Sequence, residues 1–194
     1  MSKIYTFTHG RGRRTITYEK YSLEMARDLL DSIPDQAQRA VPRALKRAMI
    51  RGRYVAKSGV LDTYTIKSRD VDEFTKTFAY RDEAGFYMRS FQFSKERFKV
   101  RPTDPSTTGR NHKLVRVQIR KDGPMQKYEF AFKHQGHIFE RVWVERLPLL
   151  FHRGPSLKGM VSGAKVADDV MEEMEKTFNE RLEHEIDWAL NGRK

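Results

Sequence analysis

Cysteine is missing from the 194 residues, and long apolar runs are missing too. Without cysteine the chain can form no disulfide, no thiolate metal site and no cysteine nucleophile. The apolar runs are too short to cross a bilayer, and the first residues, Met1–Lys3, carry no hydrophobic signal region. We therefore expect a soluble intracellular protein without a membrane contact. The length predicts a single domain over residues 1–194 with a core of its own.

Acidic residues are scarce over most of the chain and concentrated near its end. The formal net charge is +12. Residues 168–187 hold nine acids against two bases, a local net charge of −7, while residues 1–167 carry +17. A molecule with a basic body and an acidic segment can attract copies of itself as well as polyanions.

A basic amphipathic helix is predicted over residues 36–57. Asp35 is the expected N-cap, and Pro42 is expected to kink the helix or to move its start downstream. At about 100° per residue, apolar and basic side chains fall on opposite sides. The basic side either faces nucleic acid or an acidic neighbour, or is the solvated face of a helix packed on the core. Its cations are Arg39, Arg43, Lys46, Arg47 and Arg53.

A long acidic helix is predicted over residues 163–190. Its apolar residues recur at intervals of four, which overshoots a helical turn by about 40° and makes the stripe wind around the helix. Either one end packs on the chain's own sheet while the other faces a second subunit, or a curved sheet follows the stripe. The stripe consists of Val166, Val170, Met174, Phe178, Leu182, Ile186 and Leu190.

The region between the helices alternates with a period of two from Thr63 to Val144. We predict an α+β fold with a mostly antiparallel twisted sheet, packed by the basic N-terminal-half helix and the long acidic C-terminal helix. Residues 1–20 predict a hairpin extension, Ser22 is expected to cap a short helix, and residues 102–111 predict a mobile loop. The predicted strands are residues 3–8, 14–18, 64–67, 75–80, 86–89, 97–100, 114–119, 128–132 and 137–144.

Catalytic signatures are weak. His134 and His137 form an H-x-x-H pair without a third ligand at suitable spacing, which indicates surface histidines rather than a zinc site. Asp70, Asp72 and Glu73 could serve a metal-dependent nuclease, but after Ser68 they fit better as the first turn of a capped short helix. We predict no catalytic residue, no metal and no cofactor, and hence no enzyme.

Five segments, in their order along the chain, carry a family resemblance. They are AVPRALKRA (40–48), YTIKSRDV (64–71), GHIFER (136–141), RLPLLF with GPS (146–156) and FNERLEHEI (178–186). Over about residues 37–190 the chain resembles the minor tail protein Z family of tailed bacteriophages and prophages, the tail-completion proteins. The resemblance implies a structural protein of the virion that closes the head-proximal end of the tail tube and joins the connector. It also implies assembly in the host cytoplasm and a homo-oligomeric ring, hexameric to match the tail tube, with tail-tube and neck proteins as partners.

The segment before the acidic helix is the main candidate contact. Its two prolines rigidify the chain, Gly154 and Gly159 are expected to permit sharp turns, and Ser156 can cap the following helix. The apolar cluster is too dense to stay in water, so it is either tucked under the chain's own core or covered by a neighbouring protomer. The predicted subunit or connector interface is Leu147, Pro148, Leu149, Leu150, Phe151, Pro155, Phe178, Leu182 and Ile186.

Charge suggests a second contact in the ring. Basic residues could meet the acidic helix of the next subunit or line a lumen through which genomic DNA passes. The alternative function is a basic nucleic-acid-binding protein without catalytic activity, which would expose Tyr80, Phe86, Tyr87, Phe91 and Phe93 for stacking; we expect most of these in the core. The predicted electrostatic residues are Arg11, Arg13, Arg14, the five cations of the basic helix, and Glu172, Glu173, Glu180 and Glu183.

Overall fold

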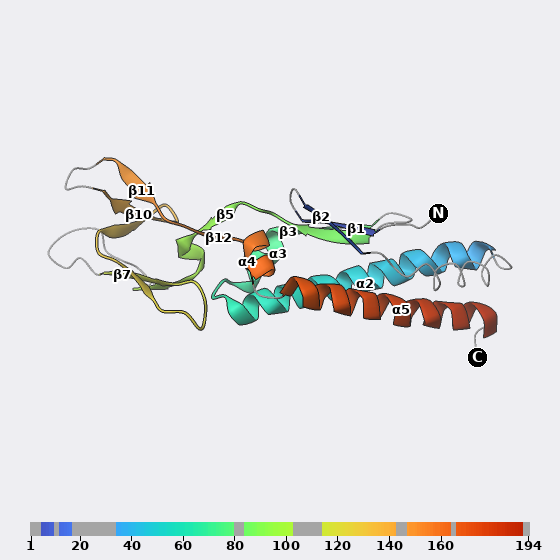
Figure 1. Cartoon of the computed structure of the whole chain (residues 1–194). Helices are drawn as coiled ribbons and strands as arrows, with labels where there is room; N and C mark the ends of the chain where they lie inside the picture. Colours follow the sequence, from blue (N-terminus) through green and yellow to red (C-terminus); the bar gives the residue numbers. More distant parts are fainter. Residues whose placement is uncertain are drawn as a thin grey trace. The chain divides into compact units, whose positions relative to one another are not determined.

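A computed structural model describes residues 5–9, 12–16, 34–79, 84–102, 114–142, 147–163 and 166–191, and side chains from Arg39 to Trp188 within these ranges. The fold is α+β with antiparallel strands, as predicted (Figure 1). The elements are β1 (Tyr5–His9), β2 (Gly12–Ile16), α2 (Pro34–Thr63), α3 (Ser68–Glu73), β3 (Thr75–Ala79), β4 (Ala84–Met88), β5 (Gln92–Ser94), the 3-10 turn η1 (Lys95–Arg97), β6 (Lys99–Arg101), β7 (Val115–Gln118), β8 (Gln126–Tyr128), β9 (Ala131–His134), β10 (His137–Arg141), β11 (Leu149–Phe151), β12 (Arg153–Ser156), α4 (Leu157–Gly163) and α5 (Val166–Asn191).

The chain groups into two compact units. The first unit takes Met1–Ala56, Thr75–Met88 and Lys165–Lys194, and the second takes Lys57–Phe74 and Arg89–Ala164. The first unit thus holds most of α2, the β3–β4 hairpin and α5, while the second holds the remaining strands with α3 and α4. The expectation of one domain over the whole chain stays a prediction.

Helix α2 is longer than predicted at both ends. It begins at Pro34, and a proline suits a first helical turn because its fixed φ is already helical and its missing N–H has no partner there. Asp35 therefore lies inside the helix and is not its N-cap, which corrects the prediction. Pro42 does not delay the start either, because the helix continues through it to Thr63.

Helices α2 and α5 lie side by side in opposite directions and form the core of the first unit (Figure 1). Ala44, Leu45 and Ala48 of α2 pack against Phe178 and Leu182 of α5. The predicted winding stripe is buried along α5, since its first five members are at most 6% exposed. Those members are Val166, Val170, Met174, Phe178 and Leu182.

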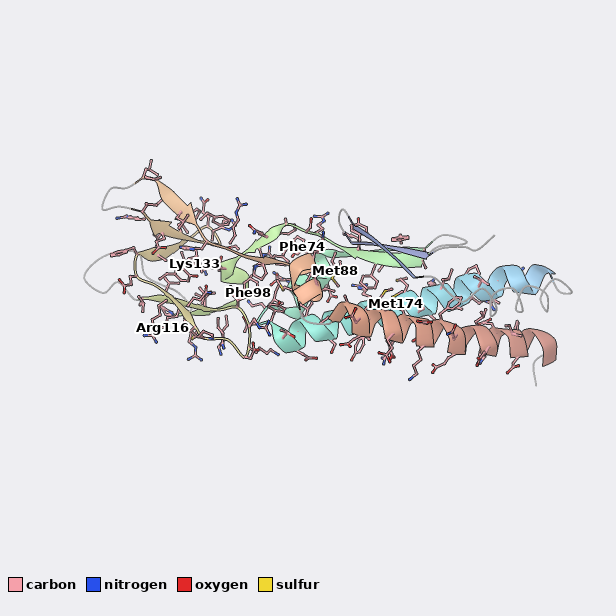
Figure 2. All side chains as sticks on the ribbon, viewed as in Figure 1. Phe74, Met88, Phe98, Arg116, Lys133 and Met174 are labelled. Atoms are coloured by element: carbon pink, nitrogen blue, oxygen red, sulfur yellow. The ribbon has the colours of Figure 1, made fainter. Side chains whose placement is uncertain are left out.

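The close approach of the two helices depends on a glycine. A Cβ added to Gly52 of α2 would lie 2.3 Å from Cγ and 2.4 Å from Sδ of Met174 on α5. The same Cβ would come within 3.4 Å of the Phe86 ring on β4. Met174 therefore fills the space that a larger residue at position 52 would need (Figure 2).

Two hairpins belong to the first unit. Strands β1 and β2 pair antiparallel from Tyr5↔Ile16 to His9↔Gly12, which confirms the predicted hairpin. Strands β3 and β4 pair from Thr75↔Met88 to Ala79↔Ala84. The second strand of this hairpin begins two residues earlier than predicted.

The strands of the described ranges form five small antiparallel sheets. In the second unit these are β6–β7–β8, β11–β10–β9 and the β5–β12 pair. The predicted strand 64–67 is wrong, because only Tyr64 pairs, as an isolated bridge with Arg120. The predicted strand 128–132 is interrupted after Tyr128, so that its two ends belong to different sheets.

The second unit has its own aromatic and aliphatic core. Phe93 is 1% exposed and stands edge-on to Phe74 and Phe91, with ring centroids 5.2 Å apart in both pairs. Gly154 of β12 lies against Phe98, whose ring would be 2.6 Å from an added Cβ (Figure 2). Gly154 is thus required for close packing inside a strand, not for the sharp turn that we predicted.

The predicted caps at Ser156 and Ser68 have different outcomes. Ser156 precedes α4, and its hydroxyl accepts a hydrogen bond from the Gly159 backbone N–H at 3.1 Å, which confirms the cap. The N-cap of α3 is Lys67, without a side-chain hydrogen bond, and Ser68 is the first helical residue. The short helix itself is confirmed.

Several expectations fall outside the described residues. They are the short helix capped by Ser22, Tyr80, the end of the predicted strand 137–144, and all but the beginning of the loop 102–111.

Candidate interaction surfaces

The predicted apolar segment forms an exposed sheet edge. β11 lies at one edge of the β11–β10–β9 sheet, and its register is Arg141↔Leu149, Glu140↔Leu150 and Phe139↔Phe151. The exposed fractions are 66% for Leu147, 37% for Leu149 and 49% for Leu150. We call these three leucines the apolar edge. Within the described chain nothing buries them.

The same sheet carries a row of three aromatic rings. Phe139 of β10 pairs with Phe132 of β9 on one side and with Phe151 of β11 on the other. Because residues directly opposite one another in adjacent strands point to the same face, the three rings share one face. Ring centroids are 6.1 Å apart for Phe132 and Phe139, and 5.5 Å apart for Phe139 and Phe151. All three side chains are half-buried, and we call them the aromatic row.

Cationic side chains lie at the two outer rings of the aromatic row. The guanidinium of Arg141 lies 5.9 Å from the centroid of Phe132, and that of Arg153 lies 5.2 Å from the centroid of Phe151. Both arginines are exposed. In the part of the chain that the structure describes, no carboxylate pairs with either of them. Each guanidinium is thus held over a ring with its N–H groups open to an incoming anion.

The opposite face of this sheet belongs to the core of the second unit. Ala131 and Ile138 are at most 1% exposed. Nearby, Nε2 of His152 lies 2.7 Å from Oε2 of Glu140, and the His152 ring lies 4.4 Å from that of Tyr128. The buried side fixes which face of the sheet is left for a ligand: the one that carries the aromatic row.

In the first unit, the basic helix and the acidic helix pair with each other. Arg43 Nη1 lies 3.1 Å from Glu185 Oε2, and Arg51 Nε lies 2.7 Å from Glu173 Oε1. Arg181 also contacts Glu185, at 2.7 Å, so this buried carboxylate is held by two guanidiniums. Arg51 lowers the pKa of Glu173 through their hydrogen bond. Sequence reasoning missed Arg51 because it lies outside the basic stripe that we delineated.

The remaining charges lie mostly on the surface, as their helical positions predict. The exposed basic residues of α2 are Arg39, Arg43, Lys46, Arg47 and Arg51, and Arg53 is half-buried. On α5, Glu172, Glu180 and Glu183 are exposed, and no cation of the described ranges pairs with them. We call these three glutamates the acidic ridge. Arg11 is outside the described residues, and Arg13 and Arg14 lie on β2 without described side chains.

Three residues of the predicted interface have a different environment from the one expected. Phe178 is 1% and Leu182 is 4% exposed, because both pack against α2 of the same chain. Ile186 is partly buried beside them. These side chains therefore form the core between the two helices. The prediction that Phe178 and Leu182 contact another subunit is wrong. Pro148 is exposed before β11, and Pro155 is half-buried in β12.

The candidate catalytic carboxylates take part in structural ion pairs. Asp70 is 5% exposed and contacts Arg97, which also lies 3.6 Å from Glu73. Asp72 accepts a hydrogen bond from Lys57 at 2.6 Å. His134 and His137 oppose each other across the β9–β10 turn. Among the side chains that the structure describes, no group of three or more suitable residues could hold a metal ion.

The aromatics named for the nucleic-acid alternative divide between core and surface. Phe86 and Phe93 are buried, whereas Tyr87 and Phe91 are 48% and 43% exposed. The aromatic row was not among those candidates. Its signal is present in the sequence as phenylalanines at alternate strand positions, but only the register brings the three strands together.

No family model, curated protein or solved structure matches the chain. None of the described helices is both long enough and apolar enough to span a membrane.

Proposed function

We propose that this chain is a structural virion protein of a tailed bacteriophage, a tail-completion protein that forms part of a ring at the head-proximal end of the tail. The observation that supports it best is the apolar edge, three exposed leucines on and just before the short edge strand β11. The resemblance to the minor tail protein Z family is the reason for proposing a phage particle and a position at the head-proximal end of its tail. The tail tube and the connector are the proposed neighbours, and the role involves no reaction.

The apolar edge favours a contact through side chains over one through strand pairing. β11 is only three residues long and follows Pro148, and both features discourage addition of another strand. Fully burying one leucine side chain is worth about 1.5–3 kcal/mol. Covering three half-exposed leucines therefore contributes enough to hold a protomer contact once flanking polar contacts are added.

The acidic ridge supports a directional contact between protomers. It lies on α5 in the first unit, whereas exposed cations such as Arg116 and Lys127 lie in the second unit. A contact between two different surfaces of the same chain is head-to-tail, and such contacts form rings when the rotation closes. Charge complementarity of this kind selects the partner and sets the register more than it adds affinity.

The experiment is complementation of a phage that lacks the gene, with the protein supplied from a plasmid. We expect Leu147→Ser combined with Leu150→Ser to abolish recovery of the protein in sedimented tails, because both side chains belong to the apolar edge. The matched control is Ile50→Ser combined with Tyr54→Ser, which removes exposed apolar side chains from α2. Circular dichroism checks that both variants are folded.

Two outcomes would contradict the proposal. Normal recovery of the folded leucine variant in tails would show that the apolar edge is not an assembly contact. Absence of the wild-type protein from purified particles, measured by mass spectrometry, would refute the virion role itself. If mass spectrometry finds the protein in the particles, electron microscopy should locate it at the head-proximal end of the tail.

A further inference from the structure

The aromatic row has the geometry of a stacking platform. Three rings from three adjacent strands lie on the exposed face of the sheet, with neighbouring centroids 5.5 and 6.1 Å apart. His137 extends this surface, because its ring stands edge-on to Phe151 with centroids 5.0 Å apart. Sheet faces of this kind bind nucleic acids by stacking two or three unpaired bases on aromatic side chains.

A polyanionic ligand also needs cationic side chains beside the rings, and two arginines lie there. Arg141 and Arg153 lie over the outer rings of the aromatic row, and neither has a carboxylate partner in the described part of the chain. Guanidinium groups bind phosphate through two parallel N–H bonds, so each can hold one phosphate beside a stacked base. By contrast, Arg43 and Arg51 of α2 each already pair with a carboxylate of α5.

We propose that the exposed face of the β9–β10–β11 sheet binds single-stranded nucleic acid, with bases on Phe132, Phe139 and Phe151 and phosphates on Arg141 and Arg153. This site goes beyond the proposed structural role. It differs from the predicted DNA-contacting residues, which lie on α2 and near the N-terminus.

The chemistry of the rings distinguishes this ligand from an acidic helix of a second copy. Carboxylates of such a helix could pair with Arg141 and Arg153, but they would then face aromatic rings whose surfaces carry negative charge density. Bases are flat and uncharged, and they gain from stacking on the same rings. Duplex DNA offers phosphates but keeps its base faces stacked inside the helix. Of these ligands, only single-stranded nucleic acid can stack bases on the rings and also place phosphates on the arginines.

The test is fluorescence anisotropy of the full chain with a labelled oligothymidylate of about 15 nucleotides, a length that covers a typical single-strand site. Replacing Phe132→Leu and Phe139→Leu keeps the positions apolar but removes two stacking surfaces. We expect the affinity to fall at least about tenfold, since stacking is worth about 1–3 kcal/mol per base.

A second variant, Arg141→Gln with Arg153→Gln, tests the phosphate contacts and changes only exposed side chains. We expect the slope of log affinity against log salt to weaken by about 1.4, because each phosphate contact on a single strand contributes about 0.7. The matched control is Arg116→Gln with Lys127→Gln on β7 and β8, which removes the same charge from exposed positions of another sheet. Its slope should change far less.

Three results would overturn the proposal. They are no binding of oligothymidylate by the wild-type chain at low salt, unchanged affinity in the folded phenylalanine variant, or equal losses in the Arg141/Arg153 variant and in the Arg116/Lys127 control. Light scattering gives the first of these results a cause: if the oligonucleotide does not bind and self-association is lost with Arg141→Gln and Arg153→Gln, the face instead takes a second copy.

Discussion

Gly52 lies where α2 comes close to Met174 of α5, and replacing it with alanine tests how the two helices are packed. The new Cβ would lie 2.3 Å from Cγ and 2.4 Å from Sδ of Met174. These atoms are in the middle of a side chain that is only 6% exposed, so Met174 cannot simply swing into water. The Phe86 ring, 3.4 Å from the same point, closes the space on another side.

Two opposing effects determine the size of the change. Alanine is favoured over glycine inside a helix by about 1 kcal/mol. Overpacking a buried site costs about 1–3 kcal/mol. At contact distances this short we expect the steric cost to win, so that Gly52→Ala lowers the free energy of unfolding by up to about 2 kcal/mol, the excess of overpacking over helix propensity.

The assay is urea unfolding followed by circular dichroism, in the wild-type and in the Met174→Ala background. Met174→Ala by itself should cost about 2–5 kcal/mol through the cavity that it leaves. In that background the obstructing atoms are gone, and Gly52→Ala should become stabilising by up to about 1 kcal/mol. The same effect of Gly52→Ala in both backgrounds would refute the claim that Met174 is what requires glycine at this position.

Three further predictions concern single contacts. Arg51→Ala should return the pKa of Glu173 toward its ordinary value, as measured by an NMR titration. Because that pKa is lowered in the folded state, the Arg51–Glu173 contact stabilises the fold at neutral pH, and this stabilisation is lost as the pH falls through the pKa. The free energies of unfolding of the variant and the wild type should therefore converge in acid. Ser156→Ala should cost about 1 kcal/mol in urea unfolding through loss of the α4 cap, and Ser156→Asn should restore most of it. Phe93→Ala should lower the free energy of unfolding by about 3–5 kcal/mol, whereas Phe91→Ala, at a 43% exposed position, should cost clearly less.

Periodic segments made the helices and most strands predictable. The four-residue interval on α5 predicted an apolar stripe that winds along the helix but left open what covers it, and the structure shows that Val166 to Leu182 are buried. The short strands β5, β11 and β12 were missed, and the equally short β6 and β8 were predicted only with shifted ends, because three or four residues show little periodicity. The Tyr64–Lys67 segment alternates like a strand, but beyond the Tyr64 bridge it forms no ladder with any described strand.

The candidate surfaces were predictable only in part, for a similar reason. The apolar composition around Leu149 is visible in the sequence, and so is its incompatibility with water. Which side chains share a face depends on pairings between distant residues, such as Phe139 with Phe151. Sequence patterns do not encode those pairings. The aromatic row therefore emerged from the register, whereas the apolar edge was expected from composition.

The segregated charges have two separate uses in this fold. Part of the attraction between basic and acidic residues is satisfied inside the first unit, where Arg43 and Arg181 hold the buried Glu185. Such a pair is only weakly screened by salt, because one partner is out of water. The acidic ridge is exposed, so any contact that it makes with another protomer weakens as the salt concentration rises. If the ring forms through this ridge, its assembly should be sensitive to salt at concentrations that leave the helix pair intact.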